Sequence, residues 1–295
     1  MDVPVTPDQA RMPSDRDGVS EAPRVVALAT KHGKQDQFDG PFRSHLNWSL
    51  RLAEIDTDTF GTFTPETERT LSAAATAEAK ARAGMRATGL EVGLASEGSF
   101  GPHPHSSMIA LAVEIAVCVD DRRGLVLAEQ HHTTETNFAH AHVRSARELP
   151  DWYLEGAKFP SHGLVVHPRH CPVPARKGIH DLDRLVAAID AAATASDDGY
   201  ATVQTDKRAH HNPTRQRAIA IVAERLALRI ATPCPSCAAP GFGLTEVIFG
   251  LPCDWCAGPT DLPAAQVFGC FRCDYRAREG VAQLADPGQC PRCNP

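Results

Sequence analysis

Apolar and polar positions along the chain alternate at two different periods, which predicts strands and helices in mixed order. Short apolar runs bounded by turn residues are typical of strands. They occur at residues 24–30, 91–96, 107–120, 125–133, 163–167 and 200–205. Helix formers, or apolar residues every three to four positions, predict helices at residues 65–88, 145–158, 181–194 and 213–230. This order indicates the α/β class, with a mixed-sheet domain.

Local signals mark the boundaries of several elements. Pro65 suits the first turn of a helix, and Gly89 suits its C-cap. Asn212 followed by Pro213 predicts the start of another helix. Residues 121–124 read as a tight turn, which predicts a hairpin between the strands on either side.

Cysteine spacing gives the strongest chemical signal. Of the ten cysteines, all but Cys118 and Cys171 lie near the C-terminus as four C-x-x-C pairs. The pairs are Cys234/Cys237, Cys253/Cys256, Cys270/Cys273 and Cys290/Cys293. Two cysteines separated by two residues can point both thiolates at one ion, and two such turns complete a tetrahedral site. Four pairs therefore predict two structural zinc sites with four cysteines each.

The spacing leaves open which pairs combine. The segments between consecutive pairs, 238–252, 257–269 and 274–289, are similar in length, and each can hold one short hairpin. The simplest pairing is therefore sequential. It puts the first two pairs, through Cys256, in one site and the last two pairs, from Cys270, in the other. A cross-braced pairing of alternate pairs stays open. Disulfides, a thioredoxin-like redox motif and an iron–sulfur cluster are weaker alternatives.

The chain divides into three parts on this pattern. Residues 1–23 hold Pro, Asp, Ser and Gly without periodicity, so we expect a disordered tail. Residues 24–230 form the predicted α/β domain, and residues 231–295 form a double zinc-ribbon module. The module has few large apolar residues, so zinc would supply much of its folding free energy. We expect a structural or protein-contact role for it.

Composition and charge limit the partners. The 295 residues carry 30 basic and 36 acidic side chains, a formal charge of −6. Binding to a phosphate backbone requires the opposite sign, so nucleic acid is not an expected partner. No apolar run is long enough to span a membrane, and the N-terminus does not resemble a secretory signal. These features predict a cytoplasmic protein without membrane contact.

Two polar clusters in the α/β domain suggest phosphate chemistry, although the common phosphate-binding motifs are missing from the sequence. The first is the loop from Thr30 to Lys34 at the end of a predicted strand, where lysines can pair with phosphate. The second is a set of carboxylates, Asp58, Glu68 and Glu97, on separate predicted elements. Converging carboxylates suit Mg²⁺ shared with a polyphosphate. A solvated loop and a favourable helix-dipole position for Glu68 are the alternatives.

A third cluster lies at residues 206–215. It places Lys207, Arg208 and Arg215 around a predicted helix N-terminus, and helix N-termini bind anions. Helix capping with a basic surface is the alternative interpretation.

Several segments resemble one known family. They are ATKHGK (29–34), DTDTFGTFTPETERT (56–70), GLASEGSFGPHP (93–104), TETNF (134–138), FPSHGL (159–164), TDKRAHHNPTR (205–215) and CPSCAAPGFGLTEVIFGLPCDWC (234–256). Together they look like the bacterial domain-of-unknown-function family 6671. The resemblance covers roughly residues 24–295 and implies no established activity.

A second, more distant resemblance concerns the order of elements. A strand ending in Thr-x-x-x-Lys, a helix with Lys80, a strand ending in Glu97-Gly and a long hairpin are similar to the inosine/xanthosine triphosphate pyrophosphatase-like superfamily. The resemblance implies that Lys34 and Lys80 bind phosphates and that Glu97 holds Mg²⁺. The acidic position expected before Lys80 falls on alanine, which leaves Glu68 as its substitute.

The leading hypothesis is a Mg²⁺-dependent hydrolase of a nucleotide or another phosphoanhydride. Its catalytic carboxylates would be Glu97, Glu68 and Asp58. Its substrate-binding residues would be Thr30, Lys34, Lys80 and Arg208. The alternative is a non-enzymatic zinc-ribbon protein that contacts another protein, or less favourably a nucleic acid. The sequence does not indicate the oligomeric state.

Overall fold

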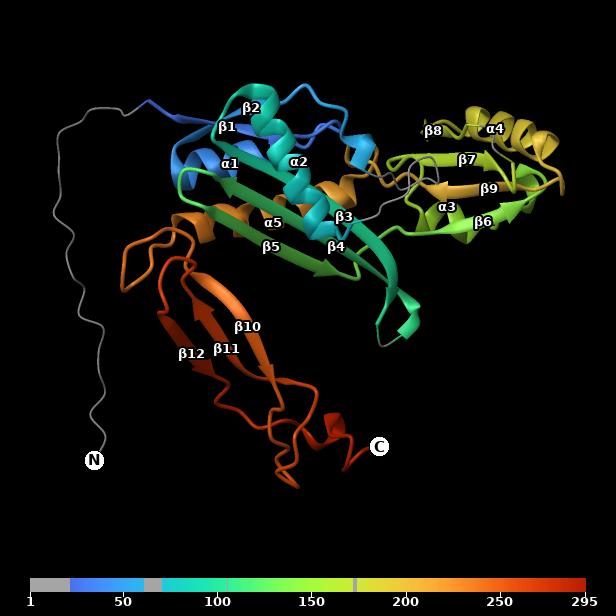
Figure 1. The fold of residues 1–295 in the computed structure, drawn as a ribbon. Helices are drawn as coiled ribbons and strands as arrows, with labels where there is room; N and C mark the ends of the chain where they lie inside the picture. The colour runs from blue at the N-terminus through green and yellow to red at the C-terminus, as the bar shows by residue number, and fades with distance from the viewer. Residues whose placement is uncertain (1–21, 61–70, 105, 172–173) are drawn as a thin grey trace.

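The computed structural model describes residues 22–60, 71–104, 106–171 and 174–295 (Figure 1). The predicted tail at residues 1–23 lies almost entirely outside the described residues, as do Pro65 and Glu68. In the described ranges the chain forms three sheets, which belong to two α/β units and a C-terminal module. The predicted class, α/β with a mixed sheet and a C-terminal double ribbon, is confirmed.

The first sheet has five strands in the order β2-β1-β3-β4-β5. Its strands are β1 (Arg24–Ala29), β2 (Trp48–Leu52), β3 (Val92–His103), β4 (Ser106–Asp120) and β5 (Leu125–Thr133). β1 pairs in parallel with β2 and β3, whereas β3, β4 and β5 form an antiparallel meander. The predicted hairpin at residues 121–124 joins β4 to β5.

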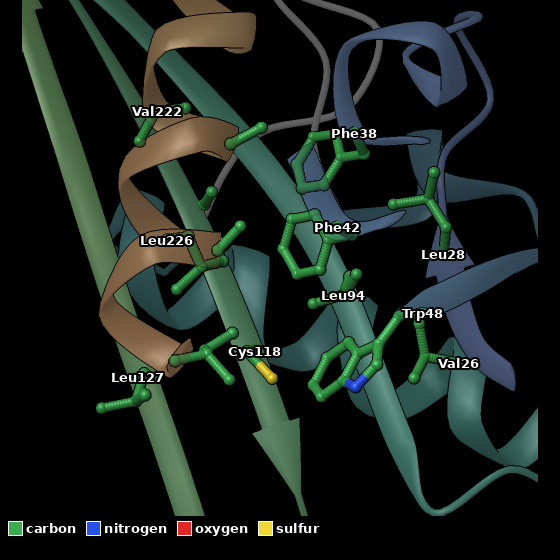
Figure 2. Packing of buried hydrophobic residues seen from close by; sticks show 14 of the residues in the cluster. Val26, Leu28, Phe38, Phe42, Trp48, Leu94, Cys118, Leu127, Val222 and Leu226 are labelled. Carbon is green, nitrogen blue, oxygen red and sulfur yellow. The ribbon is translucent and has the colours of Figure 1, made fainter. Parts of the chain in front are cut away.

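Three helices cover this sheet: α1 (Gln35–Leu46), α2 (Ala73–Thr88) and α5 (Pro213–Ala231). On one face, α1 and α5 bury a large cluster that contains Phe38, Phe42 and Leu226 (Figure 2). On the other face, α2 packs closely through alanines and Met85. A Cβ at Gly93 of β3 would lie 2.6 Å from Met85 Cγ, so the strand has glycine where α2 approaches.

The second sheet is an insertion between β5 and α5. Its strands are β6 (His140–Val143), β7 (Leu164–Pro168), β8 (Arg176–Ile179) and β9 (Ala201–Thr205), in the antiparallel order β6-β9-β7-β8. Helices α3 (Asp151–Gly156) and α4 (Leu182–Ala195) bury a separate core with it. The span 24–230, which the sequence predicts as one domain, therefore contains two sheets, and the buried cluster of the second is separate from the clusters on the two faces of the first.

The C-terminal module continues directly from α5. It is a three-stranded antiparallel sheet of β10 (Gly243–Phe249), β11 (Pro263–Gly269) and β12 (Arg276–Gly280), in that order. Arg229 of α5 links the start of this module, here called its near end, to the first sheet. It donates from Nε to the carbonyl of Gly241 in the module at 3.3 Å and from Nη1 to Glu129 of β5 at 2.7 Å. Elsewhere along the described ranges, short 3-10 helices occur at Thr57–Phe60 (η1), Ala146–Glu148 (η2) and Ala209–His211 (η3), and one lies in the module at Pro287–Gln289 (η4).

Helix boundaries follow the capping signals where these are present. Asn212 caps α5 by accepting from the amide of Arg215 at 2.9 Å, as predicted. The helix predicted from residue 65 has its described start at Ala73, where Ser72 caps it at 3.2 Å, and it ends at Gly89 as predicted. The helix predicted at 145–158 is instead split into η2 and α3, because Pro150 interrupts it.

Among the α-helices and strands of the two α/β units, α1, β2, β6 and β8 have no counterpart in the sequence prediction. The helix α1 contains Gly40 and Pro41, which are poor helix formers, and is held by the burial of Phe38 and Phe42. None of the helices in the described ranges is long and apolar enough to cross a membrane.

Candidate functional site

A cavity of about 310 Å³ lies between the two α/β units. The first unit lines it with the loop after β1, η1, α2 and β3, and the second unit with β7, β8, β9 and the chain leading into α5. Among the described lining residues, seven are Lys or Arg and three are Asp or Glu. A strongly basic hollow in an acidic protein indicates a local anion site.

The sequence-predicted site residues gather at this cavity. Thr30, Lys34, Asp58, Lys80, Glu97 and Arg208 all line it. Glu68 belongs to the segment 61–70, outside the described residues, so its predicted role stays a prediction. These residues belong to different elements and loops, so the fold brings side chains that are distant in sequence to one cavity.

Lys34 lies at the end of the loop that follows β1. Gly33 takes a left-handed conformation (φ 64°), which turns the chain into α1. The buried Lys34 Nζ donates to the carbonyl and hydroxyl oxygens of Ser96 at 3.1 and 3.0 Å. Burial, and then the nearby charge of Arg215, lower the pKa of Lys34 to about 8. A bound anion would remove this penalty on the ammonium group.

Thr30 opens the same loop. Its buried Oγ1 has no hydrogen-bond partner among the described residues. Buried hydroxyls are normally hydrogen-bonded, so an unsatisfied one beside a cavity indicates a position where a ligand or water completes the bond.

Lys80 and Glu97 form a buried ion pair across the cavity wall, with 2.5 Å between Nζ and Oε2. The sequence predicts Glu97 at a strand end, and this is wrong, because β3 continues to His103 through its pairing with β4. However, the parallel partner β1 ends where Ala29 pairs with Ala95. Glu97 therefore projects just beyond the end of β1, beside the Thr30–Lys34 loop.

Asp58 lies on η1 at the rim. It accepts from Lys31 Nζ at 2.7 Å and contacts His32 Nε2 at 3.2 Å. Burial lowers the pKa of His32 to about 4, although the charge of Asp58 opposes this, so the imidazole is neutral at pH 7. Asp58 is thus held in place by one cation and one neutral ring.

The wall of the cavity that the second unit forms, here called the second wall, is also basic. Arg208 donates to the buried carboxylate of Asp206, with Nη2 at 2.6 Å from Oδ2. Lys207 Nζ lies 4.3 Å from the ring centroid of Phe138, a cation–π contact. Burial, and then the charge of Arg215, lower the pKa of Lys207 to about 8. The charge of the Arg215 guanidinium therefore lowers the pKa of both Lys207 and Lys34.

The sequence indicated the basic character of Arg215 but not its partner. Arg215 Nε donates to Glu114 Oε1 at 2.6 Å, and both side chains are almost fully buried. A Cβ at Gly98 would lie 2.5 Å from Glu114 Oε1, so glycine is needed at that position of β3. The available signal was that Glu114 is the one charged residue in the apolar run 107–119.

The cysteines form two separate groups in the C-terminal module. One contains Cys234, Cys237, Cys270 and Cys273, and the other Cys253, Cys256, Cys290 and Cys293. Within each group the four sulfurs lie within 4.8 Å of one another. Sulfurs about 2.3 Å from a central zinc form a tetrahedron with edges of about 3.8 Å. The closest Sγ···Sγ distances, 3.6 to 3.9 Å, fit these edges.

The sequential pairing predicted from the gaps is wrong, and alternate pairs combine instead. Each gap between pairs holds one strand rather than a hairpin. β10 leads from the first pair to the second, β11 returns to the third, and β12 leads to the fourth. Antiparallel strands bring the first and third pairs to one end of the sheet and the second and fourth pairs to the other.

Within the described ranges, groups of three or more potential metal ligands occur only at these two cysteine clusters. The carboxylates that line the cavity therefore do not by themselves form a closed metal cage. Glu97 and Asp58 both line the cavity, and each is paired with a lysine, Glu97 with Lys80 and Asp58 with Lys31.

No curated protein matches the chain. Residues 80–295, more than half of the chain, match the profile of a family described as "Domain of unknown function (DUF6671)". The match includes Lys80, Glu97, the second wall of the cavity and all eight paired cysteines. The chain therefore belongs to the DUF6671 family.

Proposed function

We propose that the protein is a Mg²⁺-dependent hydrolase of phosphoanhydrides, with nucleoside triphosphates as the first class to test. The observation that carries the proposal is the cavity between the two units, with seven basic and three acidic lining residues in the described ranges. A multiply charged phosphate ester or anhydride is the ligand class that such a lining stabilises best. The resemblance to triphosphate pyrophosphatases supports the same class.

The proposed binding residues are Thr30, Lys34, Lys80 and Arg208. The hydroxyl of Thr30 would donate to a phosphate oxygen, which would complete the hydrogen bonding of its buried Oγ1. Lys34 and Lys80 would neutralise phosphate charge from the first wall, and Arg208 would do so from the second. The lowered pKa of Lys34 supports this role, because the ammonium gains most when an anion replaces lost hydration.

The proposed catalytic carboxylates are Glu97 and Asp58, with Glu68 as a further candidate outside the described residues. Mg²⁺ would neutralise charge on the phosphates, while Glu97 and Asp58 hold the ion and orient water. Substrate binding would change the Lys80–Glu97 pair. A phosphate that takes over Lys80 would leave the Glu97 carboxylate available for the cation.

The test is a panel of nucleoside triphosphates with Mg²⁺, assayed for phosphate and diphosphate release. We expect Glu97→Gln to lower turnover at least 100-fold, since it removes a charged group from the proposed metal site. Glu91→Gln is the matched control, because Glu91 precedes β3 on the exposed surface. No turnover above the Glu97→Gln level on any substrate would contradict the proposal.

For the cysteine clusters we propose zinc as the metal, in two structural sites. Four thiolates in a tetrahedron suit Zn²⁺, and closed four-cysteine sites are structural rather than catalytic. A backbone donor supports the thiolate form, since the amide of Arg272 donates to the sulfur of Cys270 at 3.2 Å. Because such thiolates require a reducing compartment, we place the protein in the cytoplasm.

A second candidate function is protein binding by the C-terminal module without catalysis. It is favoured by two exposed aromatic side chains there, Trp255 at 77% and Phe249 at 63% exposure. Aromatic residues are enriched at protein interfaces. The test is affinity capture with the wild type and with Trp255→Ser/Phe249→Ser. A captured protein that both chains retain equally would contradict a role for these residues.

A further inference from the structure

Four basic groups from separate parts of the chain, Lys34, Lys80, Lys207 and Arg215, line the cavity. Lys34 Nζ donates to Ser96, the residue next to the Glu97 that pairs with Lys80. Arg215 donates from Nε to Glu114 of β4 and from Nη1 to the carbonyl of Lys207. Lys80 belongs to α2 in the first unit, whereas Lys207 follows β9 in the second. Arg215, at the start of α5, therefore lies between basic groups on the two walls.

This arrangement differs from a site for a ligand that is charged at one end. Such a ligand needs cations on one wall and an apolar or aromatic surface on the other, where its uncharged part would lie. The second wall instead presents Lys177, Lys207 and Arg208 to the cavity, and beside them lie Gln204, Thr205, the Asp206 that pairs with Arg208, and one apolar residue, Val165. Among the described lining residues none is Phe, Tyr or Trp.

Two aromatic rings contact the ammonium group of Lys207 but do not line the cavity. Phe138 and Phe100 lie under Lys207, with their ring centroids 4.3 and 5.5 Å from Nζ. Their π faces stabilise the ammonium group in its partly buried position. Phe100 of β3 in the first unit and Phe138, which leads into the second sheet, thus both support a positive charge that borders the cavity.

We infer that the ligand of this cavity is a linear oligophosphate with negative charge at both ends, of the class of inorganic tripolyphosphate. One terminal phosphate is held by the Thr30–Lys34 loop with Lys80, and the other by Lys207 and Arg208. Arg215 lies nearest to the central phosphate. This inference rests on the proposed phosphoanhydride hydrolysis and names its substrate class.

The reaction balances without a further reactant. The oxygen of one water forms a bond to a terminal phosphorus, and the bridging P–O bond to that phosphorus breaks. The bridging oxygen stays with diphosphate, the other product is orthophosphate, and the protons of the water pass to products and solvent. No atom changes its oxidation state.

The experiment compares tripolyphosphate with a panel of nucleoside triphosphates by calorimetric titration and by phosphate release. It uses the full-length, zinc-loaded chain, with and without Mg²⁺. Lys207→Met tests the second wall, Lys34→Met tests the first, and Lys207→Arg restores the charge. Arg86→Met is the control, because it removes an exposed charge near the far end of α2. Thermal melting checks that each variant is folded.

We expect tripolyphosphate to bind at least tenfold more tightly than any nucleoside triphosphate. Lys34→Met and Lys207→Met should each weaken its binding about tenfold or more, as loss of a charged contact does, and Lys207→Arg should recover most of the loss. Tighter binding of a nucleoside triphosphate, or unchanged tripolyphosphate binding in Lys207→Met, would overturn the inference and leave the proposed function standing. Absence of both binding and turnover for every phosphate would overturn the two together.

Discussion

The cavity and the C-terminal module are both polar regions built from charged or ionisable groups, but they are stabilised in opposite ways. Around the cavity, buried ion pairs such as Glu114–Arg215 rest on two large hydrophobic cores. In the module, the hydrophobic cluster contains little more than cysteines, Ala239 and Phe242. From this difference we expect the first region to hold its shape without a ligand and the second to depend on bound metal.

The largest expected effect is on the module. Structural zinc contributes roughly 10–16 kcal/mol in small zinc domains. Cys270→Ser should therefore unfold the near end of the module and lower the zinc content from two ions to one per chain, as measured by elemental analysis and limited proteolysis. Cys171→Ser, outside the module, is the control. Two zinc ions retained in Cys270→Ser would contradict the role of Cys270 as a ligand, and cleavage near Cys290 instead of near Cys234 would contradict the alternate pairing.

We also expect a chelator to unfold the C-terminal module without unfolding the two α/β units. Metal removal should make residues 232–295 sensitive to protease, while the sheets that line the cavity stay folded, because their cores contain no metal ligand of the two clusters. Hydrogen exchange resolved by residue would measure this. Simultaneous unfolding of both regions would show that the module also stabilises the α/β units.

The next largest effect concerns the buried ion pair. Glu114→Gln leaves the guanidinium of Arg215 buried without its carboxylate, which should cost about 3–5 kcal/mol in the free energy of unfolding. Glu129→Gln breaks a more exposed pair with Arg229 and should cost about 1 kcal/mol or less. Denaturant titration gives both values. Equal losses in the two variants would mean that burial does not determine the strength of these pairs.

A smaller effect should follow pH. The pKa of Lys34 is about 8 in the folded protein against an ordinary 10.5, so the unfolded chain binds more protons between these values. Stability of the wild type should therefore rise between pH 8 and 10.5 relative to Lys34→Met, by up to roughly 3 kcal/mol. Lys207 titrates in both proteins and largely cancels in the difference. Parallel stability curves would show that Lys34 has an ordinary pKa.

The smallest effect is expected at Gly98. In Gly98→Ala the new methyl would meet the Glu114 carboxylate and the Arg215 guanidinium, which must shift slightly, at a cost of about 1–2 kcal/mol. Gly101→Ala is a control on the same strand, because nothing lies within 4 Å of a Cβ there. A neutral Gly98→Ala would show that the ion pair has room to move.

The residues selected from the sequence gather at one cavity, except Glu68, which lies outside the described residues, but the fold around that cavity was predicted less completely. Lys34 was visible because it follows an apolar run, whereas Lys80 was selected only through the resemblance to the pyrophosphatase-like superfamily. The second sheet was not separated from the first, because its strands β6 and β8 are only four residues long and carry polar residues. The ion pair of Arg215 depends on β4 and α5 meeting in space, which no local pattern records.

The cysteine clusters show the same limit in another form. Spacing was sufficient to predict that the eight cysteines form two groups of four, because two residues between cysteines define a local geometry. It was not sufficient to predict which pairs combine. The segment between two pairs is long enough for a short hairpin or for one strand with its connections, and only the sheet β10-β11-β12 shows that the strand is correct.

The central claim is that the cavity binds and hydrolyses a phosphoanhydride. The most direct measurement is phosphate release from tripolyphosphate and nucleoside triphosphates with Mg²⁺ by the wild type and by Glu97→Gln, with Glu91→Gln as control. The account predicts turnover in the wild type and the control, and at least a 100-fold loss in Glu97→Gln. Equal rates in all three proteins, or no release by any of them, would contradict it.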